Sequence, residues 1–175
     1  MKNTIVFSKN FIVPYRNEKK IDGDIYIVGD LIGDDASALE VFGDLYVTGR
    51  IYIDDIYVHG NIICGRLDVS TCQCTGDIHV ESVATAAKVT CMGIFSVDSL
   101  CYIDILTVYE SAFVHLYIGE SFRAIDEIYC KSSLTFSKSL ISGGNVKCTG
   151  EILPCSDDFE ICVKGNLVSE NIHIG

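Results

Sequence analysis

The sequence has no tryptophan and is poor in proline and methionine, with two of each in 175 residues. Its longest apolar runs are four residues, which excludes a membrane-spanning helix of roughly 20 apolar residues. The first 20 residues also lack a hydrophobic stretch of about 7 to 15 residues followed by a small-residue cleavage site, so no signal peptide is predicted. We therefore expect a cytoplasmic protein.

Basic residues are also scarce, with 13 Lys and Arg against 24 Asp and Glu and a formal net charge of −11. This balance argues against nucleic acid as a partner, because such binding depends on Lys and Arg that neutralise phosphates. The charge is unevenly distributed: residues 1–20 hold five basic residues and one acidic residue, and the remainder holds eight and 23. The charge pattern thus separates a basic leader, residues 1–20, from an acidic body, residues 21–175.

A short phrase recurs through the body, consisting of Gly, then Asp or Asn, then alternating apolar residues. Clear copies begin at Gly23, Gly43, Gly60, Gly76, Gly93, Gly144 and Gly165, and weaker copies begin at Glu110 and Asp126. The basic period is about 17 residues, which is typical of a solenoid. The two longest intervals contain turn-rich insertions, at residues 34–37 and 154–158, as expected of loops at a corner.

Apolar residues alternate with period 2 inside each repeat, as in Leu45/Val47 and Ile51/Ile53, and this predicts three short strands per repeat. Superposed repeats align these residues in columns. One column contains Ile25, Leu45, Ile62, Ile78, Phe95, Ala112, Ile128, Val146 and Leu167. The third face is less regular, and its expected inward pairs include Leu67/Val69, Val83/Thr85 and Cys101/Ile103.

Stacked columns predict an all-β fold, a single-stranded parallel β-helix (β-solenoid) of about nine coils of roughly 17 residues with a triangular cross-section. A β-sandwich is the competing interpretation, but antiparallel hairpins would not keep equivalent residues one period apart. Parallel crossovers are right-handed in about 98% of cases. Left-handed hexapeptide solenoids are an exception with a strict [LIV]-G-x4 rhythm, and this sequence departs from it, so we expect the right-handed form.

The nine cysteines, without an export signal, favour reduced thiols over disulfides. Six of them are expected to point inward and pack as small hydrophobes. These are Cys64, Cys72, Cys74, Cys91, Cys130 and Cys148. Their spacing is not that of zinc-binding pairs, so we expect no metal and no cofactor. Cys155 and Cys162 are predicted to be exposed.

Signals of catalysis are weak. His79 and His115 could act as the general base of a hexapeptide-type acyltransferase, but solvent-facing strand residues are the simpler interpretation. The sequence has no G-x-S-x-G, P-loop or H-E-x-x-H motif, and we expect no enzyme. Acidic corner residues such as Asp24 and Asp44 could bind a row of calcium ions, as in nonapeptide solenoids, but the G-G-x-G-x-D motif of those proteins is missing. We therefore expect these side chains to form hydrogen bonds with the local backbone instead.

Two kinds of surface are candidates for binding. Eight aromatic side chains are predicted to point outward, and a contiguous patch of them would bind a partner. They are Tyr26, Tyr46, Tyr52, Tyr57, Tyr102, Phe113, Tyr117 and Tyr129. An uncapped solenoid end exposes unpaired backbone groups and an apolar cross-section, so Leu167, Ile172 and Ile174 are predicted to line an end-to-end contact. The leader is open to two interpretations, a rung or cap of the solenoid or an anchor at an anionic membrane.

The repeat resembles that of the bactofilins, bacterial polymer-forming cytoskeletal proteins. The resemblance lies in residues 21–31, their echo at 41–53 and the 16 to 18 residue period, and covers residues 21–175. It implies a right-handed triangular β-helix that assembles end to end into non-polar filaments without nucleotide, associates with the inner membrane through its N-terminal segment, and scaffolds cell-envelope enzymes.

We therefore expect a structural or scaffold protein that self-associates through its ends. Its expected partners are other copies of itself, a membrane surface contacted by the leader, and cell-envelope proteins, with a cytoplasmic location at the inner face of the membrane. The alternative is a β-solenoid binding module that holds a glycan or protein on an outer aromatic face, with Tyr46 and Tyr52 as its contact residues.

Overall fold

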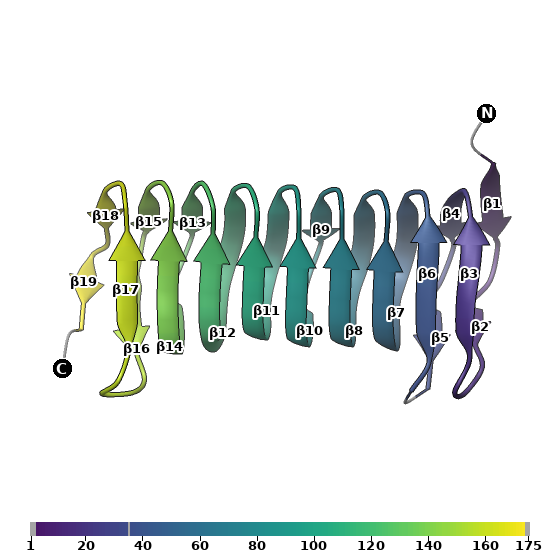
Figure 1. The fold of residues 1–175 in the computed structure, drawn as a ribbon, viewed down its shortest axis with the longest axis horizontal. Helices are drawn as coiled ribbons and strands as arrows, with labels where there is room; N and C mark the ends of the chain where they lie inside the picture. The colour runs from purple at the N-terminus through teal and green to yellow at the C-terminus, as the bar shows by residue number, and fades with distance from the viewer. Residues whose placement is uncertain (1–2, 35, 174–175) are drawn as a thin grey trace.

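The computed structural model describes residues 3–34 and 36–173, and its regular elements in this part of the chain are all β-strands. They form one 19-stranded parallel sheet (Figure 1). The strands are β1 (Thr4–Phe7), β2 (Phe11–Val13), β3 (Glu18–Asp22), β4 (Asp24–Ile27), β5 (Leu31–Gly33), β6 (Ala38–Phe42), β7 (Leu45–Val58), β8 (Ile62–Cys74), β9 (Ile78–Val80), β10 (Ala84–Cys91), β11 (Phe95–Val108), β12 (Ala112–Ala124), β13 (Ile128–Cys130), β14 (Leu134–Ser142), β15 (Val146–Cys148), β16 (Glu151–Pro154), β17 (Glu160–Val163), β18 (Leu167–Val168) and β19 (Asn171–Ile172).

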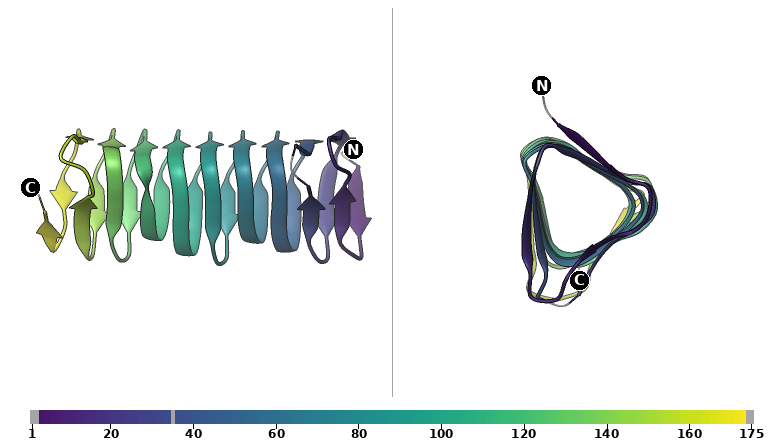
Figure 2. Two further views of the ribbon diagram at one scale, coloured as in Figure 1. Left: turned by 90° about the horizontal axis from the view of Figure 1, so that it is seen from below. Right: turned by 90° about the vertical axis from the view of Figure 1, so that its right-hand side faces the viewer.

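The sheet winds into a β-solenoid of about 10 turns with a triangular cross-section (Figure 2). Strands β1 and β4 begin face A, β2 and β5 begin face B, and β3 and β6 begin face C. The long strands β7, β8, β11 and β12 bend at the corners and contribute to all three faces. In Figure 1 the front strands run upward and β1 runs downward behind them, while the chain advances from right to left. The coil is therefore right-handed, as predicted.

Residues 3–22 form the first coil of this solenoid. β1 pairs with β4, β2 with β5 and β3 with β6, all in parallel. Asn3 stands where later coils have Gly, and its carbonyl oxygen accepts a hydrogen bond of 2.8 Å from the N–H of Asp24. Because this coil lacks the Gly-Asp phrase, the repeat pattern begins only at Gly23, and the sequence predicted about nine coils instead of about 10.

The interior is one continuous hydrophobic cluster that extends from Phe11 to Ile152. The predicted column beginning at Ile25 is confirmed, since each member pairs with its equivalent in the next coil. On face B, the inward pair is Ala84/Ala86, aligned with Leu67/Val69, and the prediction of Val83/Thr85 was wrong by one residue. At the corner between faces A and B, three residues separate Val80 from Ala84, whereas two residues separate Cys64 from Leu67 in the preceding coil. This extra residue shifts the alternation.

Tyr117, predicted to point outward, is fully buried at 0% exposure. It aligns with Cys101 and Leu134 in an inner column. Two residues later, Gly119 aligns with Phe136 and leaves its part of the interior without a side chain. A Cβ atom on Gly119 would come 2.4 Å from the Tyr117 hydroxyl oxygen. The tyrosine ring thus occupies the space that Gly119 leaves open.

Polar side chains at the corner between faces C and A bond from coil to coil. The Oδ1 atom of Asp44 accepts hydrogen bonds from the N–H of Asn61 at 2.7 Å and from its Nδ2 at 3.0 Å. The Oδ1 atom of Asn61 accepts one from the N–H of Asp77 at 2.8 Å, and Asp77 repeats the contact with the N–H of Ile94 at 2.8 Å. The predicted bonds to the local backbone were wrong in this respect: each side chain satisfies the N–H of the following coil, because parallel strands place equivalent residues one coil apart.

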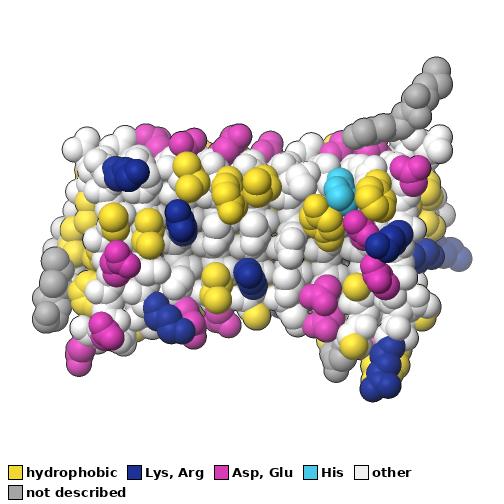
Figure 3. All heavy atoms as spheres, viewed as in Figure 1, with side chains coloured by type: hydrophobic (Ala, Val, Ile, Leu, Met, Phe, Trp, Pro, Cys, Tyr) yellow, Lys and Arg dark blue, Asp and Glu magenta, His cyan; other side chains and the backbone are white. Residues whose placement is uncertain are grey.

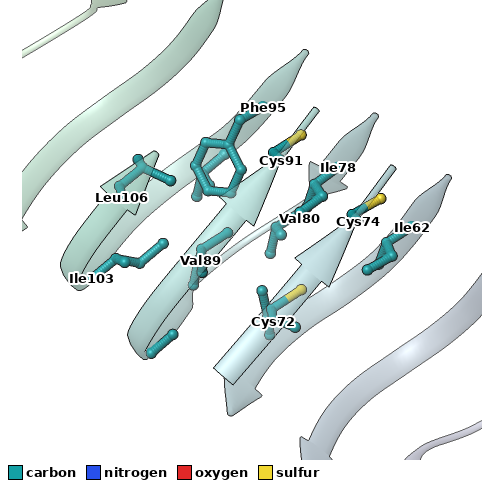
Figure 4. Close-up of a cluster of buried hydrophobic side chains, with 14 of the residues drawn as sticks. Ile62, Cys72, Cys74, Ile78, Val80, Val89, Cys91, Phe95, Ile103 and Leu106 are labelled. Carbon is teal, nitrogen blue, oxygen red and sulfur yellow. The ribbon is translucent and has the colours of Figure 1, made fainter. Parts of the chain in front are cut away.

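The six cysteines predicted to point inward are buried, as is Cys101, and all nine are free thiols. Figure 4 shows Cys72, Cys74 and Cys91 among the aliphatic side chains of the interior. The thiol of Cys74 donates to the carbonyl oxygen of Gly60 at 2.9 Å, and Ser142, in the same column, donates to that of Asp126 at 2.8 Å. Cysteine at this corner therefore fills apolar space and also supplies a weak donor. Cys155 and Cys162 are exposed, as predicted.

Candidate interaction surfaces

In the last described coil, at the C-terminal end of the solenoid, the inner columns are more exposed than in the coil before. Leu167 pairs with Val146 and is half-buried, and Ile172 pairs with Ile152 and is 37% exposed. In the coil before, Val146 and Ile152 are both 0% exposed. The predicted contact residue Ile174 lies outside the described residues. The structure therefore places Leu167 and Ile172 together at one open end, on neighbouring faces.

The N-terminal end is more closely covered. Ile5 is 36% exposed, but Phe11 is buried and its ring lies 4.5 Å from that of Phe7. Lys19 occupies the inner-column position beside Leu39, and its Nζ atom lies 4.6 Å from the centre of the Phe11 ring. A lysine at an inner position of an edge strand is a known device against uncontrolled edge pairing. This end is therefore apolar with a cation above it.

Both ends also present strand edges. Among the described residues, β1, β2 and β3 each pair with a strand of the second coil only. At the other end, as far as the chain is described up to residue 173, β17, β18 and β19 each pair only with a strand of the coil before. Their outer edges carry the same rows of N–H and C=O groups that join the internal coils. Such edges are templates for another parallel coil.

The structure does not bring the predicted aromatic residues Tyr46 and Tyr52 together. Tyr46 lies on face A, where its ring centre is 6.3 Å from that of Tyr26 and it lines a hollow of about 280 Å³ with Asn61 and His79. Tyr52 lies on face B, 41% exposed, with the Arg50 guanidinium 4.5 Å from its ring centre. The two tyrosines belong to different faces and do not form one outer aromatic surface.

Face C carries an interaction that links three successive coils. The Nζ atom of Lys20 lies 2.8 Å from Glu40 Oε2, and Nε2 of His59 lies 3.0 Å from Glu40 Oε1. The ring of Phe42 stacks on His59 at 4.5 Å. Hydrogen bonds from His59 and Lys20 lower the pKa of Glu40, and the bonds to Glu40 and Glu18 raise the pKa of Lys20. The cluster ties the first coil to the two after it.

Sequence reasoning missed an exposed apolar row at the corner between faces C and A. It consists of Met92, Tyr109 and Ile125, which are 45%, 45% and 41% exposed and occur in consecutive coils. Figure 3 shows hydrophobic side chains gathered along this edge. The signal was available, since each residue directly follows the last inward residue of face C.

Polar groups near His79 have the composition of a hydrolytic triad. Nδ1 of His79 lies 2.8 Å from Ser96 Oγ, and Nε2 lies 3.8 Å from Asp98 Oδ2. The second distance is longer than a hydrogen bond, and the side chains of His79 and Asp98 are 40% and 60% exposed. Exposed side chains in the middle of a regular ladder lack the water-excluded setting in which such groups act. Pairing between surface side chains explains this geometry.

Within residues 3–34 and 36–173 we find no group of three metal-ligating side chains. The same residues contain no helix of the length and apolarity needed to cross a bilayer. In comparisons with known proteins, the chain matches no family model, no curated protein and no solved structure.

Proposed function

We propose that this chain is a non-enzymatic structural protein that self-associates through the ends of its solenoid, in a manner similar to bactofilin polymers. The observation that supports the proposal is the change in burial at the last coil, where Ile172 is 37% exposed and its equivalent Ile152 is 0% exposed. Placing another coil on this end would remove the apolar cross-section from water, and each Å² of apolar surface buried contributes roughly 25 cal/mol.

The open strand edges favour the same conclusion. A docked coil would pair the outer N–H and C=O groups of β17, β18 and β19, as internal coils pair theirs. Contacts between two different patches of the same molecule produce rings or open filaments. Because the solenoid is a straight rod in both side views, repeated end contacts would extend it along its own axis (Figures 1 and 2).

Sedimentation velocity over a range of protein concentrations tests the proposal. The wild-type chain should form species larger than a monomer, and Ile172→Asp should shift it towards the monomer because a carboxylate would then face the contact. Ile105→Asp is the matched control, since Ile105 is 41% exposed in a middle coil. A wild-type protein that remains monomeric at every concentration, or an Ile172→Asp protein that assembles like wild type, would contradict the proposal.

Further partners belong to the same proposal. The first coil carries Lys9, Arg16, Lys19 and Lys20, and basic residues close to an anionic leaflet contribute about 1 kcal/mol each. A cytoplasmic polymer at the inner face of the membrane, scaffolding cell-envelope proteins, is consistent with this coil. Co-sedimentation with vesicles that contain phosphatidylserine, compared with neutral vesicles, tests the membrane contact. Equal recovery with both vesicles would exclude a charge-dependent contact.

A second candidate function is a binding module for a glycan or protein, favoured by the hollow beside Tyr46. An aromatic ring next to the amide of Asn61 and the imidazole of His79 combines an apolar surface with a few polar groups, as in small-ligand sites. Glycan-array or pull-down binding that is lost in Tyr46→Ala and retained in Tyr102→Ala, without any polymer, would favour this function. Tyr52→Ala shows whether face B takes part.

A further inference from the structure

We infer that copies of this chain dock head to tail, with the first coil of one copy on the last coil of the next, in the register that joins the internal coils. The inference rests on the proposed self-association and adds its polarity, which differs from the non-polar filaments that the bactofilin resemblance implies. The first coil, residues 3–22, contains four basic and two acidic residues, and residues 155–173 contain one basic and four acidic residues. Opposite ends therefore carry opposite charge, and like ends would repel each other.

The first charge pair lies at the corner between faces A and B. Phe11 begins an inner column that ends at Ile172. Lys9 lies two residues before Phe11, and Glu170 lies two residues before Ile172. A copy that continues the register would place Phe11 over Ile172 and Lys9 next to Glu170. Both charged residues are exposed, so no group has to be uncovered for this contact.

The second pair lies at the corner between faces C and A. Ile21 and Val163 begin and end another inner column. Asp22 directly follows Ile21, and Lys164 directly follows Val163, and both are exposed. Continuing the register sets this carboxylate next to this ammonium group. Here the sign is reversed relative to the first pair, since the acid belongs to the first coil.

The third match lies at the corner between faces B and C. Residues 14–17, between β2 and β3, and residues 155–159, between β16 and β17, form loops that project at this same corner (Figures 1 and 2). Arg16 lies in the first loop, and Asp157 and Asp158 lie in the second. Stacking in register brings the guanidinium group to the side of the rod that carries the two carboxylates. All three corners thus match in charge.

Two positions oppose the docking. Lys19 would face the apolar side chain of Ile161 in its inner column, and one pair of like charges would meet on face C. Glu18 and Glu160 occupy equivalent positions on face C, so two carboxylates would become neighbours. The Nζ atom of Lys20 lies 3.1 Å from Glu18 Oε1 and neutralises that side of the pair. Three charge matches against one screened charge mismatch favour the head-to-tail orientation, while covering Lys19 weakens the contact. Docking of like ends would instead bring together two first coils that both carry a net positive charge.

Charge reversal tests the polarity. Lys9→Glu alone places two carboxylates together at the first corner, and Glu170→Lys alone places two ammonium groups together, so each should weaken association roughly tenfold at low salt. An equimolar mixture of the two variants should restore assembly, because every junction of an alternating rod then pairs opposite charges at this corner. Lys88→Glu reverses an exposed charge in a middle coil and should assemble like wild type. Thermal melting of each variant checks that it folds.

An alternating rod of the two variants has two kinds of junction. The Lys9→Glu copy presents a carboxylate at its first coil, and the Glu170→Lys copy presents an ammonium group at its last coil, so this junction pairs opposite charges. The other junction of the mixture joins the unchanged Lys9 of one variant to the unchanged Glu170 of the other, as in wild type. Both junctions of an alternating rod are therefore favourable, whereas each variant alone has only repulsive ones.

The outcomes separate this inference from the proposed function. A wild-type protein that never assembles overturns both. Assembly that is unchanged by either reversal, or that is not restored by mixing, overturns head-to-tail docking alone. If a variant folds poorly, carbodiimide coupling of the wild-type polymer gives the second measurement. An intermolecular amide between Lys9 Nζ and the Glu170 carboxyl, formed with loss of water, is expected in peptide mass spectra. Its absence, with couplings within the monomer detected, contradicts the register.

Discussion

The hydroxyl of Tyr117 donates to the carbonyl oxygen of Ile103 at 2.9 Å, inside an interior that is otherwise almost wholly apolar. The carbonyl oxygen of Ser121 lies 3.0 Å from the same hydroxyl, so one proton serves two acceptors. The Tyr117 ring also packs against that of Phe122 at 4.6 Å. Burial raises the pKa of this phenol, which keeps the donor protonated. A polar tip is tolerated here because its hydrogen bonds are satisfied.

Removing this hydroxyl should destabilise the fold. Tyr117→Phe would remove the donor to one buried and one part-buried carbonyl group, and we expect a loss of about 1 to 2 kcal/mol in the free energy of unfolding. Gly119→Ala should be more harmful, since its Cβ would come 2.0 Å from the carbonyl oxygen of Ile103. Urea denaturation followed by circular dichroism measures both. A Tyr117→Phe midpoint equal to that of wild type would show that the hydroxyl makes no net contribution.

The corner ladder predicts a second loss of stability. Asn61→Ala removes the acceptor for the N–H of Asp77 and the donor to Asp44, and we expect a loss of about 1 kcal/mol. Asn61→Asp keeps the acceptor but aligns three carboxylates on successive coils. Their repulsion would raise carboxyl pKa values in the folded state, so the variant's stability should fall as pH rises above about 4. Denaturation at pH 4 and pH 7, compared with wild type, tests this.

The buried thiols predict a loss of stability at alkaline pH. Burial raises the pKa of Cys64, Cys74 and Cys91 from 9.0 to about 12. A group whose pKa is higher in the folded than in the unfolded state contributes stability that is complete below pH 9 and is lost as pH rises from about 9 to about 12. The urea midpoint should fall steeply over this range. Cys74→Ser should reduce the fall, because Ser142 already fills the same role in its column.

The same burial predicts how the thiols react. Cys155 and Cys162 are exposed and the other seven cysteines are buried. A thiol reagent at neutral pH should therefore modify these two residues quickly and the seven only as the coil opens, because reaction requires an accessible thiolate. Mass spectrometry of the labelled native chain counts the modified residues. Rapid labelling of a third cysteine would place that residue at a surface that the fold does not predict.

The sequence was sufficient to predict the solenoid because its columns repeat with the strand period, and the column from Ile25 to Leu167 is correct throughout. It was insufficient where local composition competes with register. Val83 is more apolar than Ala84, so the alternation could not show the extra corner residue. Tyr117 suits an exposed strand position as well as an inner one. Its inward direction follows from its register with Cys101 and Leu134, and Gly119 leaves space for its ring. The charge matches between the ends required the register of both terminal coils.

The last prediction concerns Lys19, whose ammonium group lies above the Phe11 ring at the N-terminal end. In a docked pair this inner-column residue would face Ile161, which occupies the same column in the last coil. Covering a lysine without a partner carries an effective penalty of several kcal/mol, whereas an exposed charge contributes only about 0.2 to 1 kcal/mol to an ion pair. Lys19→Leu should therefore strengthen association, although it removes a positive charge. Lys20→Leu removes the same charge from an outward position and should weaken it. Sedimentation velocity of the two variants shows whether each change strengthens or weakens association. Weaker association of Lys19→Leu would mean that the positive charge of Lys19 contributes more to docking than its burial costs.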